Sequence, residues 1–511
     1  MKAATLGDIL RRSADQRGDW VAISFNGERR MTFGELDLAA NRMANSFADV
    51  GLDRGDRVAI FLANRPEYFT ALFALARAGL VSVPMNRRLA PAEAARVVAD
   101  AGARYMITEP AHSAVAEAVR AVAGVRGVIM VADDRGSLGP SDHLFSDLER
   151  RGAPTDPRVD IDDDEMQAIH YTSGTSGVPK GVMRSHAANL GAALGCLAAV
   201  PTFGRDAWFY TIPMHSAGVY NFAIAPLVRG ATVVITDRFD TSQTFALCAS
   251  EQITMLHMVP TQYEMMVRAE GSSPPNLPDL RTLLWGGSPM ATITSERVER
   301  WLGLPPLGVY GATEFTAMTY SNVDVYRSGR FDSVGMACDL MELRVVGGAG
   351  AELPRGEWGE LQVRGSLLMD GYFGKPDLSA SALTPDGYYR TGDWCREDED
   401  GAISVTGRIA ETILSGGENV FPLEVENVIM AMAGIVEAAV AGAPDDVWGQ
   451  AVTAFVVRSD RSISEADVVN ACRRDLAGFK APRRVVFLDD LPKNALGKVE
   501  KRELVRSLKP A

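Results

Sequence analysis

Helical and extended segments alternate from Thr32 to about Arg355, and this alternation limits the possible folds more than any other feature of the sequence. Thr32 and Glu35 match a capping box, which predicts a helix continuing through Phe47. Short β-rich runs at 56–62 and 80–84 flank a stretch with helical spacing. Repeated β-α units of this kind predict the α/β class, with parallel-type sheets covered by helices.

The sequence changes character after about Arg355, where shorter strands are joined by Gly and Asp turns. The last hundred residues alternate between strand and helix patterns, with helices expected at 422–432 and 464–476 and strands at 436–441, 451–457 and 484–488. We therefore expect two domains, a large N-terminal domain over 1–407 and a small α+β domain over 408–511.

The 511 residues include 52 lysines and arginines against 65 aspartates and glutamates, giving a formal net charge of −13. This charge repels nucleic acid, so we expect no nucleic-acid partner, and local geometry must hold any phosphate ligand. The five cysteines are scattered without a C-x-x-C pair, which favours a reducing compartment such as the cytoplasm. No apolar run reaches the roughly 18 residues of a membrane span, so we expect no integral membrane association.

A string of small residues follows the strand expected at 166–172, and it reads Ser173-Gly174-Thr175-Ser176-Gly177-Val178-Pro179-Lys180-Gly181. Its bare backbone N–H groups, hydroxyls and single ammonium suit an oligophosphate. The string is not a Walker A motif, because Lys180 stands between Pro179 and Gly181. The alternative is a surface turn with a solvated lysine.

Two further strings each end an apolar β-type run, and they read Trp285-Gly286-Gly287-Ser288-Pro289 and Tyr310-Gly311-Ala312-Thr313-Glu314. The carboxyl edge of a parallel sheet forms its ligand crevice, so Thr172, Trp285 and Tyr310 are expected at one site. Bare glycines would let a flat base lie against the backbone, and Glu314 offers a carboxylate that Mg²⁺ accepts beside phosphates. Core packing of Trp285 and Tyr310, and an exposed helix-terminal Glu314, are the alternatives.

More motifs complete the series, namely Tyr389-Arg390-Thr391-Gly392-Asp393, Gly407-Arg408, Ser415-Gly416-Gly417-Glu418-Asn419 and Pro492-Lys493-Asn494-Ala495-Leu496-Gly497-Lys498. With these motifs in order, the chain resembles the adenylate-forming superfamily over nearly its whole length. That superfamily comprises acyl-CoA synthetases, adenylation domains of peptide synthetases and firefly-type luciferases. The resemblance implies a large domain that binds ATP and an acid, and a mobile small domain that carries a catalytic lysine.

The resemblance also implies a role for each matching residue. The catalytic residues would be Lys498, Thr313, Glu314 and His215, with Glu314 as the metal ligand. The ATP-binding residues would be Thr172, Ser173, Gly174, Thr175, Ser176, Gly177, Lys180, Gly287, Ser288, Tyr310, Gly311, Thr313, Asp393, Arg408 and Lys498. The acyl pocket would contain His215, Tyr220, Trp285, Gly286 and Phe315, and the CoA tunnel Gly416 and Gly417. An Asp393–Arg408 ion pair, a buried His215 and a tight glycine turn are the purely structural alternatives.

The role implied for Lys498 has a physical reason. A carboxylate that attacks the α-phosphate gathers negative charge on both reactants, and an ammonium between them stabilises the transition state more than the separated reactants. The implied hinge lies just after Arg408, where Ala410 replaces the Asp or Lys common in relatives. This departure bears on the rate and resting state of the domain rotation.

The expected function is that of an AMP-forming acid–thiol ligase, which uses ATP, Mg²⁺ and CoA. It would convert a small carboxylic acid to acyl-AMP and pyrophosphate, and then to acyl-CoA. An adenylate-forming amide synthetase that uses an amine in place of CoA is the nearest alternative. A non-catalytic nucleotide-binding protein is an alternative from another class, and a homodimer is left open.

Overall fold

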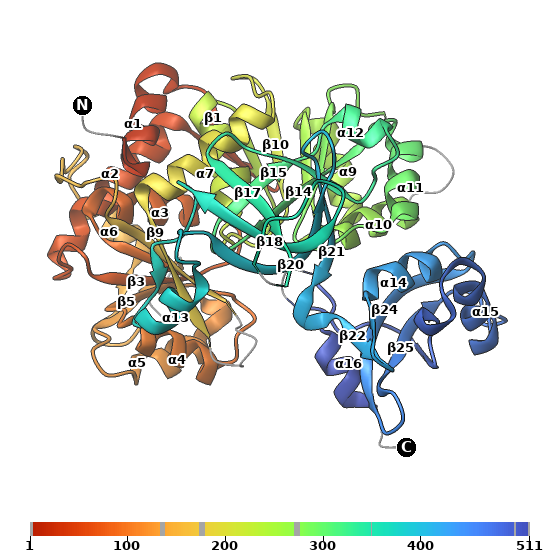
Figure 1. Ribbon diagram of the computed structural model, residues 1–511. Coiled ribbons are helices and arrows are strands. Elements are labelled where there is room, and N and C mark those ends of the chain that lie inside the picture. The colour runs from red at the N-terminus through yellow and green to blue at the C-terminus, as the bar shows by residue number, and fades with distance from the viewer. Residues whose placement is uncertain are drawn as a thin grey trace.

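The computed structural model describes residues 4–132, 138–172, 179–269, 276–348, 350–494 and 497–508. The chain forms a large domain and, after Arg408, a small domain that lies beneath it at lower right in Figure 1. Two sheets with helices packed around them build the large domain, and one sheet builds the small domain. The expected α/β class and the large and small domains are confirmed.

The larger sheet crosses the whole large domain. In spatial order its strands are β17 (Met341–Val346), β18 (Trp358–Gly365), β20 (Tyr389–Glu397), β21 (Ile403–Arg408), β16 (Ser333–Ala337), β15 (Thr316–Tyr320), β14 (Pro306–Ala312), β13 (Thr282–Trp285), β12 (Met255–Met258), β10 (Ala207–Tyr210), β11 (Thr232–Ile235), β1 (Val21–Phe25) and β2 (Arg29–Thr32). Pairing is parallel from β14 to β1, whereas β15 and the strands beyond it pair antiparallel. The sheet is therefore parallel only in part.

The second sheet is also mixed. Its order is β19 (Gly371–Tyr372), β9 (Lys180–Ser185), β8 (Met166–Thr172), β4 (Val81–Pro84), β3 (Arg57–Phe61), β5 (Tyr105–Thr108), β6 (Gly127–Met130) and β7 (His143–Leu144). The predicted strand 166–172 is confirmed as β8, and β9 returns antiparallel beside it with Thr172 paired to Lys180. The paired strands β8 and β9 thus flank the glycine-rich string.

Helices cover both sheets (Figure 1). Their bounds are α1 (Leu6–Arg17), α2 (Phe33–Asp49), α3 (Pro66–Ala78), α4 (Pro91–Ala101), α5 (Ser113–Arg120), α6 (Phe145–Arg151), α7 (His186–Ala199), α8 (Ala225–Arg229), α9 (Thr241–Ser250), α10 (Pro260–Ala269), α11 (Thr292–Leu302), α12 (Val323–Arg327) and α13 (Pro376–Ala382). The predicted capping box opens α2, because the Thr32 hydroxyl accepts the Glu35 N–H at 3.2 Å and Glu35 accepts the Thr32 N–H at 2.8 Å. Leu36, Met43 and Phe47 then bury one face of this helix.

The small domain has its own core. Its sheet runs β23 (Glu418–Val420), β22 (Ile413–Ser415), β25 (Gly449–Arg458) and β24 (Ile435–Asp445), with β26 (Arg484–Leu488) parallel to β25. Its helices are α14 (Pro422–Met430), α15 (Glu465–Asp475) and α16 (Lys501–Ser507). Val425, Ile429 and Val468 pack on Val452 and Val456 of the sheet. This buried core lets the domain keep its shape as a unit.

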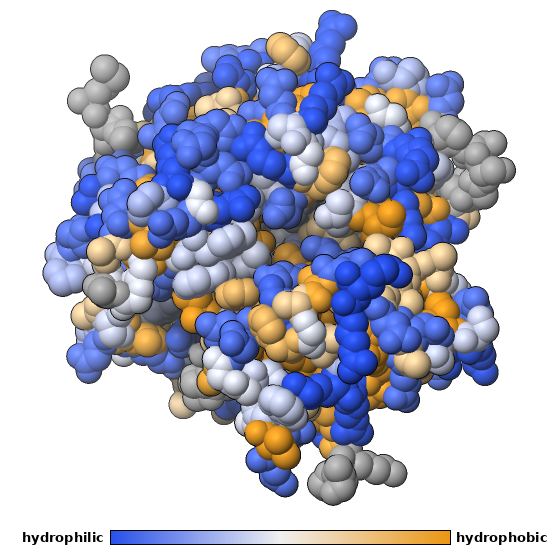
Figure 2. All heavy atoms as spheres, turned by 45° about the vertical axis from the view of Figure 1, so that its right-hand side comes forward, coloured by the Kyte–Doolittle hydropathy of each residue, from blue (hydrophilic) through white to orange (hydrophobic). Residues whose placement is uncertain are grey.

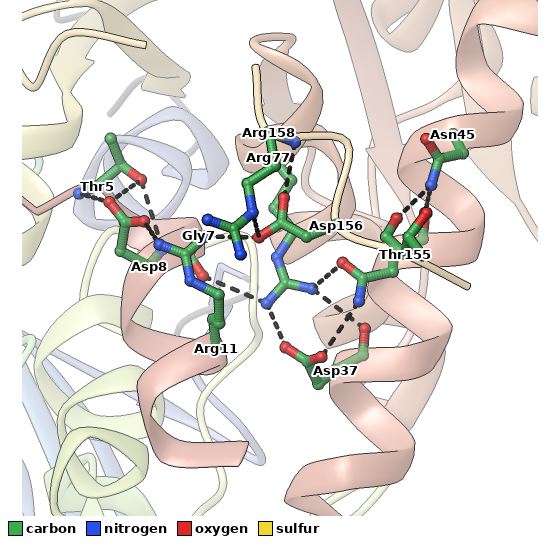
Figure 3. Close-up of polar contacts among 11 residues, drawn as sticks. Thr5, Gly7, Asp8, Arg11, Asp37, Asn45, Arg77, Thr155, Asp156 and Arg158 are labelled. Atoms are coloured by element: carbon green, nitrogen blue, oxygen red, sulfur yellow. Dashed lines mark hydrogen bonds and ion pairs between the residues drawn. The ribbon is translucent and has the colours of Figure 1, made fainter. Parts of the chain in front are cut away.

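A polar cavity of about 320 Å³ lies beneath α1, and we call it the N-terminal cavity (Figure 3). Arg11 of α1 donates to Asp156 at 2.5 Å and also contacts Asp8. Arg77 of α3 is buried, and it binds Asn41 of α2 at 2.5 Å, the Gly7 carbonyl at 3.3 Å and Asp37. These contacts clamp three helices to the segment that leads into β8.

Hydrophilic side chains cover most of the face shown in Figure 2, with apolar side chains in separate patches. Within the described parts of the chain, no helix has both the length and the apolar character needed to cross a bilayer.

Candidate active site

A cleft of about 290 Å³ lies where the two domains meet. Loops and strand ends of the larger sheet line one wall, and they contribute Trp285, Gly287, Ser288, Tyr310, Gly311, Asp393 and Arg408. The small domain lines the other wall and contributes Glu411, Phe421, Pro422, Gly497 and Lys498. Of the ten predicted nucleotide-binding residues that the structure describes, the cleft therefore brings together seven, including the predicted catalytic lysine, whereas Thr172, Lys180 and Thr313 are not part of its lining.

Asp393 lies at the centre of a hydrogen-bonded group in the cleft. β20 and β21 place Asp393 directly opposite Arg408, and the Arg408 Nε lies 2.8 Å from Asp393 Oδ1. The Tyr310 hydroxyl donates to Asp393 Oδ2 at 2.5 Å. Burial raises the pKa of Tyr310 well above its usual range, so its hydroxyl stays a donor, and burial also raises the pKa of Asp393 against the opposing effect of Arg408. The carboxylate is thus held in one orientation at the cleft wall.

The Lys498 loop rests against the large domain. Lys498 and Asn494 bind each other through backbone and side-chain hydrogen bonds of 2.9 and 3.1 Å, which closes the loop. Arg88 of the large domain donates to the Asn494 carbonyl at 3.1 Å. A side chain at Gly497 would come within 3.0 Å of the Thr261 hydroxyl, and Gly497 has a φ of +77°, so glycine suits this seat. The Lys498 ammonium reaches into the cleft and lies 4.0 Å from Glu411.

Glu314 follows β14 and is not part of the lining of the cleft, although its charge helps to raise the pKa of Arg408. The Tyr372 hydroxyl donates to Glu314 Oε1 at 3.0 Å, and the Glu314 carbonyl accepts the Met369 N–H at 2.7 Å. Glu314 Oε2 has no hydrogen-bond partner among the described residues. Those residues include no cluster of three or more His, Cys, Asp and Glu side chains arranged for a metal. A hard cation here would depend on Glu314 and on phosphate oxygens, which fits Mg²⁺.

Thr172 and Lys180 flank the glycine-rich string at the ends of β8 and β9. The Lys180 Nζ lies 5.4 Å from the centre of the Tyr372 ring, in a cation–π arrangement. Ser173, Gly174, Thr175, Ser176 and Gly177 lie outside the described residues, so their predicted phosphate role stays a prediction. Thr313, beside Glu314, is half-buried and its carbonyl accepts from the buried Arg184 at 3.4 Å.

The residues predicted for the acyl pocket lie deeper, mostly beyond the lining of the cleft. Tyr220 is fully buried and donates to Gln167 at 2.7 Å, and the His215 carbonyl lies 3.1 Å from His170 Nδ1. Burial lowers the pKa of His215 to about 4, so this imidazole is neutral at pH 7. Trp285 is also buried, and its ring N–H donates to the Pro306 carbonyl at 3.3 Å.

Gly286 and Phe315 are enclosed by other side chains. A Cβ at Gly286 would come within 2.7 Å of Val309. The Phe315 ring lies 5.7 Å from the Tyr310 ring and 5.9 Å from the Tyr389 ring. The predicted acyl-pocket roles of these residues therefore stay predictions.

Gly416 and Gly417 do not lie in the cleft. They form the exposed two-residue turn between β22 and β23, with φ of +62° and +87°, in the left-handed region that glycine adopts without strain. The Gly416 N–H donates to the Trp448 carbonyl at 3.0 Å. In this arrangement of the domains, the predicted CoA-binding glycines face solvent, and their CoA role stays a prediction.

Three buried side chains near the site lie outside every predicted motif, and they are Tyr372, Arg184 and His257. The His257 ring stacks on Phe222 at 3.6 Å, and neither ring nitrogen has a hydrogen-bond partner among the described residues. A Cβ at the neighbouring Gly286 would lie 3.6 Å from His257 Nε2. Because His257 stands within an apolar strand and has no glycine or charged neighbour in β12, no local pattern marked it.

The chain is similar to known proteins over its whole length. Its residues 10–373 match the family model of AMP-binding enzymes, and residues 424–498 match the AMP-binding enzyme C-terminal domain. A feruloyl-CoA synthase from Amycolatopsis sp is 34% identical over 484 residues, 94% of each chain. An indoleacetate–CoA ligase from Aromatoleum aromaticum is 35% identical over 508 residues, 98% of this chain and 97% of the relative.

A solved structure agrees with these relatives. ATP-bound MatB from Rhodopseudomonas palustris is 30% identical and superposes with a TM-score of 0.90 over 99% of each chain. The chain therefore belongs to the AMP-binding enzyme family, within the adenylate-forming superfamily.

Proposed function

We propose that this enzyme is an AMP-forming carboxylate–CoA ligase. The observation that carries the proposal is the cleft itself, where Lys498 of the small domain faces the Tyr310–Asp393–Arg408 group of the large domain. Most of the predicted nucleotide-binding residues that the structure describes line this cleft or lie at its edge. The relatives named above are carboxylate–CoA ligases, which supports the same reaction class for this chain.

In the first half-reaction, a carboxylate oxygen attacks the α-phosphorus of ATP and the bond to pyrophosphate breaks. Asp393 accepts hydrogen bonds from the ribose hydroxyls, with Arg408 and Tyr310 holding its orientation. Tyr310 and the glycines before Pro289 enclose the base. Lys498 places its ammonium between the two negative reactants, where it stabilises the charge that develops in the transition state.

We assign the phosphate and metal sites to the region where Lys180 and Glu314 both contact Tyr372, which we call the phosphate and metal edge. Lys180 and the glycine-rich string hold the pyrophosphate portion of ATP. Glu314, with one carboxylate oxygen unpartnered among the described residues, would hold Mg²⁺. When bound, the ion would neutralise phosphate charge, and Thr313, the residue before Glu314, would supply a hydroxyl.

In the second half-reaction, the CoA sulfur attacks the acyl carbon, the bond to the AMP oxygen breaks, and the thiol proton is lost. Because Gly416 and Gly417 face solvent here, their proposed role requires the small domain to turn about the segment after Arg408. That turn withdraws Lys498 after its step is complete. The short 3₁₀ segment Ile409–Glu411, which contains Ala410, is the proposed hinge.

The proposed acid has an apolar body. Buried Tyr220, Phe222 and Trp285 form the apolar surroundings, and the histidines among them are neutral at pH 7. We extend the proposal to aryl and medium-chain acids, in line with the feruloyl and indoleacetate substrates in the names of the two relatives. A cytoplasmic location agrees with five free cysteines, all of them buried. The proposal leaves a homodimer open as the alternative to a monomer.

The test is a panel of acids assayed for pyrophosphate and AMP release, each with and without CoA. Hexanoate, decanoate, benzoate, cinnamate, ferulate and indole-3-acetate cover the classes proposed. We expect at least one acid to give stoichiometric AMP and acyl-CoA. AMP released only with an amine would favour the amide synthetase, and absence of AMP with every acid would refute the proposal.

A further inference from the structure

The segment from Met369 to Lys375 joins the two sheets beside the proposed phosphate and metal edge, and we call it the bridging segment. Its first residue, Met369, donates its N–H to the Glu314 carbonyl at 2.7 Å. At its other end, the Phe373 N–H donates to the Gly181 carbonyl at 2.7 Å, and Lys375 Nζ donates to the Pro179 carbonyl at 2.9 Å. The segment thus contacts the backbone of Glu314 itself and the backbone on both sides of Lys180.

Tyr372 is the side chain of this segment that reaches both charged groups. Its hydroxyl donates to Glu314 Oε1 at 3.0 Å, while its ring face lies 5.4 Å from the Lys180 ammonium. The side chain is 4% exposed. A single phenol therefore contacts one anionic and one cationic residue that the proposed function assigns to the same ligand.

The backbone around Tyr372 fixes its direction. β19 pairs Tyr372 with Val182 of β9, and the Tyr372 N–H donates to the Ser379 hydroxyl at 2.8 Å. Tyr389 places its hydroxyl 3.2 Å from the Tyr372 hydroxyl, which limits rotation of the phenol.

The Glu314 loop has other supports, so the phenol is not needed merely to hold the loop in place. The Arg184 guanidinium, fully buried, donates to the Leu367 carbonyl at 3.1 Å and the Thr313 carbonyl at 3.4 Å. Met369 holds the Glu314 carbonyl. What Tyr372 adds is a contact with the carboxylate itself, because its hydroxyl donates to Oε1, while Oε2 has no hydrogen-bond partner among the described residues.

We propose that Tyr372 is a positioning residue that couples the metal-binding carboxylate of Glu314 to the phosphate-binding ammonium of Lys180. The inference rests on the proposed function, because it assumes that triphosphate and Mg²⁺ occupy this edge. Outer hydrogen bonds to a metal-binding carboxylate are worth ten- to a hundredfold in metal affinity. The ring face acts separately, since a cation–π contact steadies a lysine without any metal.

The two halves of the side chain can be separated by substitution. Tyr372→Phe removes the hydroxyl and keeps the ring beneath Lys180, so it should fold normally. Tyr372→Leu removes both. Binding of ATP to the enzyme without acid or CoA is then measured by calorimetry, once with Mg²⁺ and once with EDTA, so the readout does not depend on turnover.

We expect Tyr372→Phe to weaken ATP binding on the order of ten- to a hundredfold with Mg²⁺ and to leave it unchanged with EDTA. Tyr372→Leu should also weaken binding in EDTA, by about two- to thirtyfold, because Lys180 loses its aromatic support. A Tyr372→Phe enzyme that binds ATP as tightly as the wild type with Mg²⁺, or that loses affinity equally in both conditions, would overturn the inference.

The chain contains a matched control. Tyr388 makes the same two kinds of contact at the surface, with its hydroxyl donating to Glu342 at 3.1 Å and its ring 3.9 Å from the Arg344 guanidinium. Tyr388→Phe should change neither titration, and a loss equal to that of Tyr372→Phe would show that the effect is not specific. If the wild type binds no ATP under either condition, the proposed function fails. If it binds ATP and Tyr372→Phe binds equally well, only this inference fails.

Discussion

The N-terminal cavity and the cleft between the domains are similar in volume, about 320 and 290 Å³, but their charged side chains have different partners. In the N-terminal cavity, Arg11 and Arg77 are each bonded to carboxylates or carbonyls of neighbouring elements. In the cleft, the Lys498 ammonium is 4.0 Å from Glu411, a long and exposed pairing. We infer that Arg77, whose charge is satisfied within the fold, serves stability, whereas the Lys498 ammonium is available to a ligand.

The largest effect should come from removing the Lys498 ammonium, which has only a long ion pair with Glu411 among the described residues. Lys498→Ala should slow acyl-adenylate formation by about a hundred- to a thousandfold, because a preorganised positive group is lost from the transition state. Thioester formation from supplied acyl-adenylate should remain near normal, and so should the melting temperature. Pyrophosphate exchange and thioester assays measure the two halves.

Lys493 provides the control for that substitution, because it lies in the same segment and forms a close ion pair with Glu437 at 2.7 Å. Lys493→Ala should leave both half-reactions close to the wild type. A Lys498→Ala enzyme that loses both half-reactions equally would contradict the assigned role.

The opposite result is expected in the N-terminal cavity. Arg77→Leu removes the partner of Asp37 from a largely buried network, so the free energy of unfolding should fall by about 3 kcal/mol. The kcat and KM of the enzyme that remains folded should not change. Urea unfolding and steady-state kinetics on the same preparation test this, and altered kinetics in fully folded enzyme would erase the distinction between the two regions.

The buried histidines near the residues predicted for the acyl pocket add a prediction on how stability depends on pH. Burial lowers the pKa values of His170 and His257 to about 3, below the roughly 6.5 of an unfolded histidine. Their contribution to stability is therefore present above about pH 6.5 and is lost as pH falls toward 3. Below pH 6.5 each of these histidines should lower the free energy of unfolding by about 1.4 kcal/mol per pH unit, because only the unfolded chain takes up the proton.

His257→Leu isolates one of these contributions. The free energy of unfolding, measured in urea between pH 7 and 5, should fall less steeply in the variant by about 1.4 kcal/mol per unit. An identical pH slope in the two proteins would show that His257 is protonated when folded.

The smallest effect is expected at the rim of the N-terminal cavity. Arg11 is partly exposed, so its pairing with Asp156 is screened by solvent. A double-mutant cycle of Arg11→Ala with Asp156→Ala should give a coupling below about 1 kcal/mol. A much larger coupling would place this ion pair with the buried network of Arg77.

Local signals predicted the elements well. The Thr32–Glu35 capping box, the strand at 166–172 and the strand at 484–488 are all present with the expected bounds or nearly so. Each of these depends on residues that are close in sequence, such as a cap, an apolar run or a turn. The structure pairs Asp393 with Arg408 across two strands, which is the ion pair named above as the structural alternative, and their nucleotide-binding role stays a prediction.

The sequence could not predict contacts that depend on the pairing of distant strands. Tyr372 contacts both Glu314 and Lys180 only because β19 joins the edge of the second sheet beside β9. Its sequence neighbourhood has no periodicity that marks this position. Similarly, Tyr310 was expected at the end of a parallel strand, but β14 continues to Ala312 and pairs antiparallel with β15, which has no local signature.

The hydrogen bond that holds the Lys498 loop against the large domain has an evolutionary consequence. Arg88 holds this loop through the main-chain oxygen of Asn494, which every amino acid possesses. Substitutions at that position therefore leave the acceptor in place. If the proposed domain rotation occurs, we expect drift in the side chains of the loop to change its rate, while the hydrogen bond from Arg88 persists.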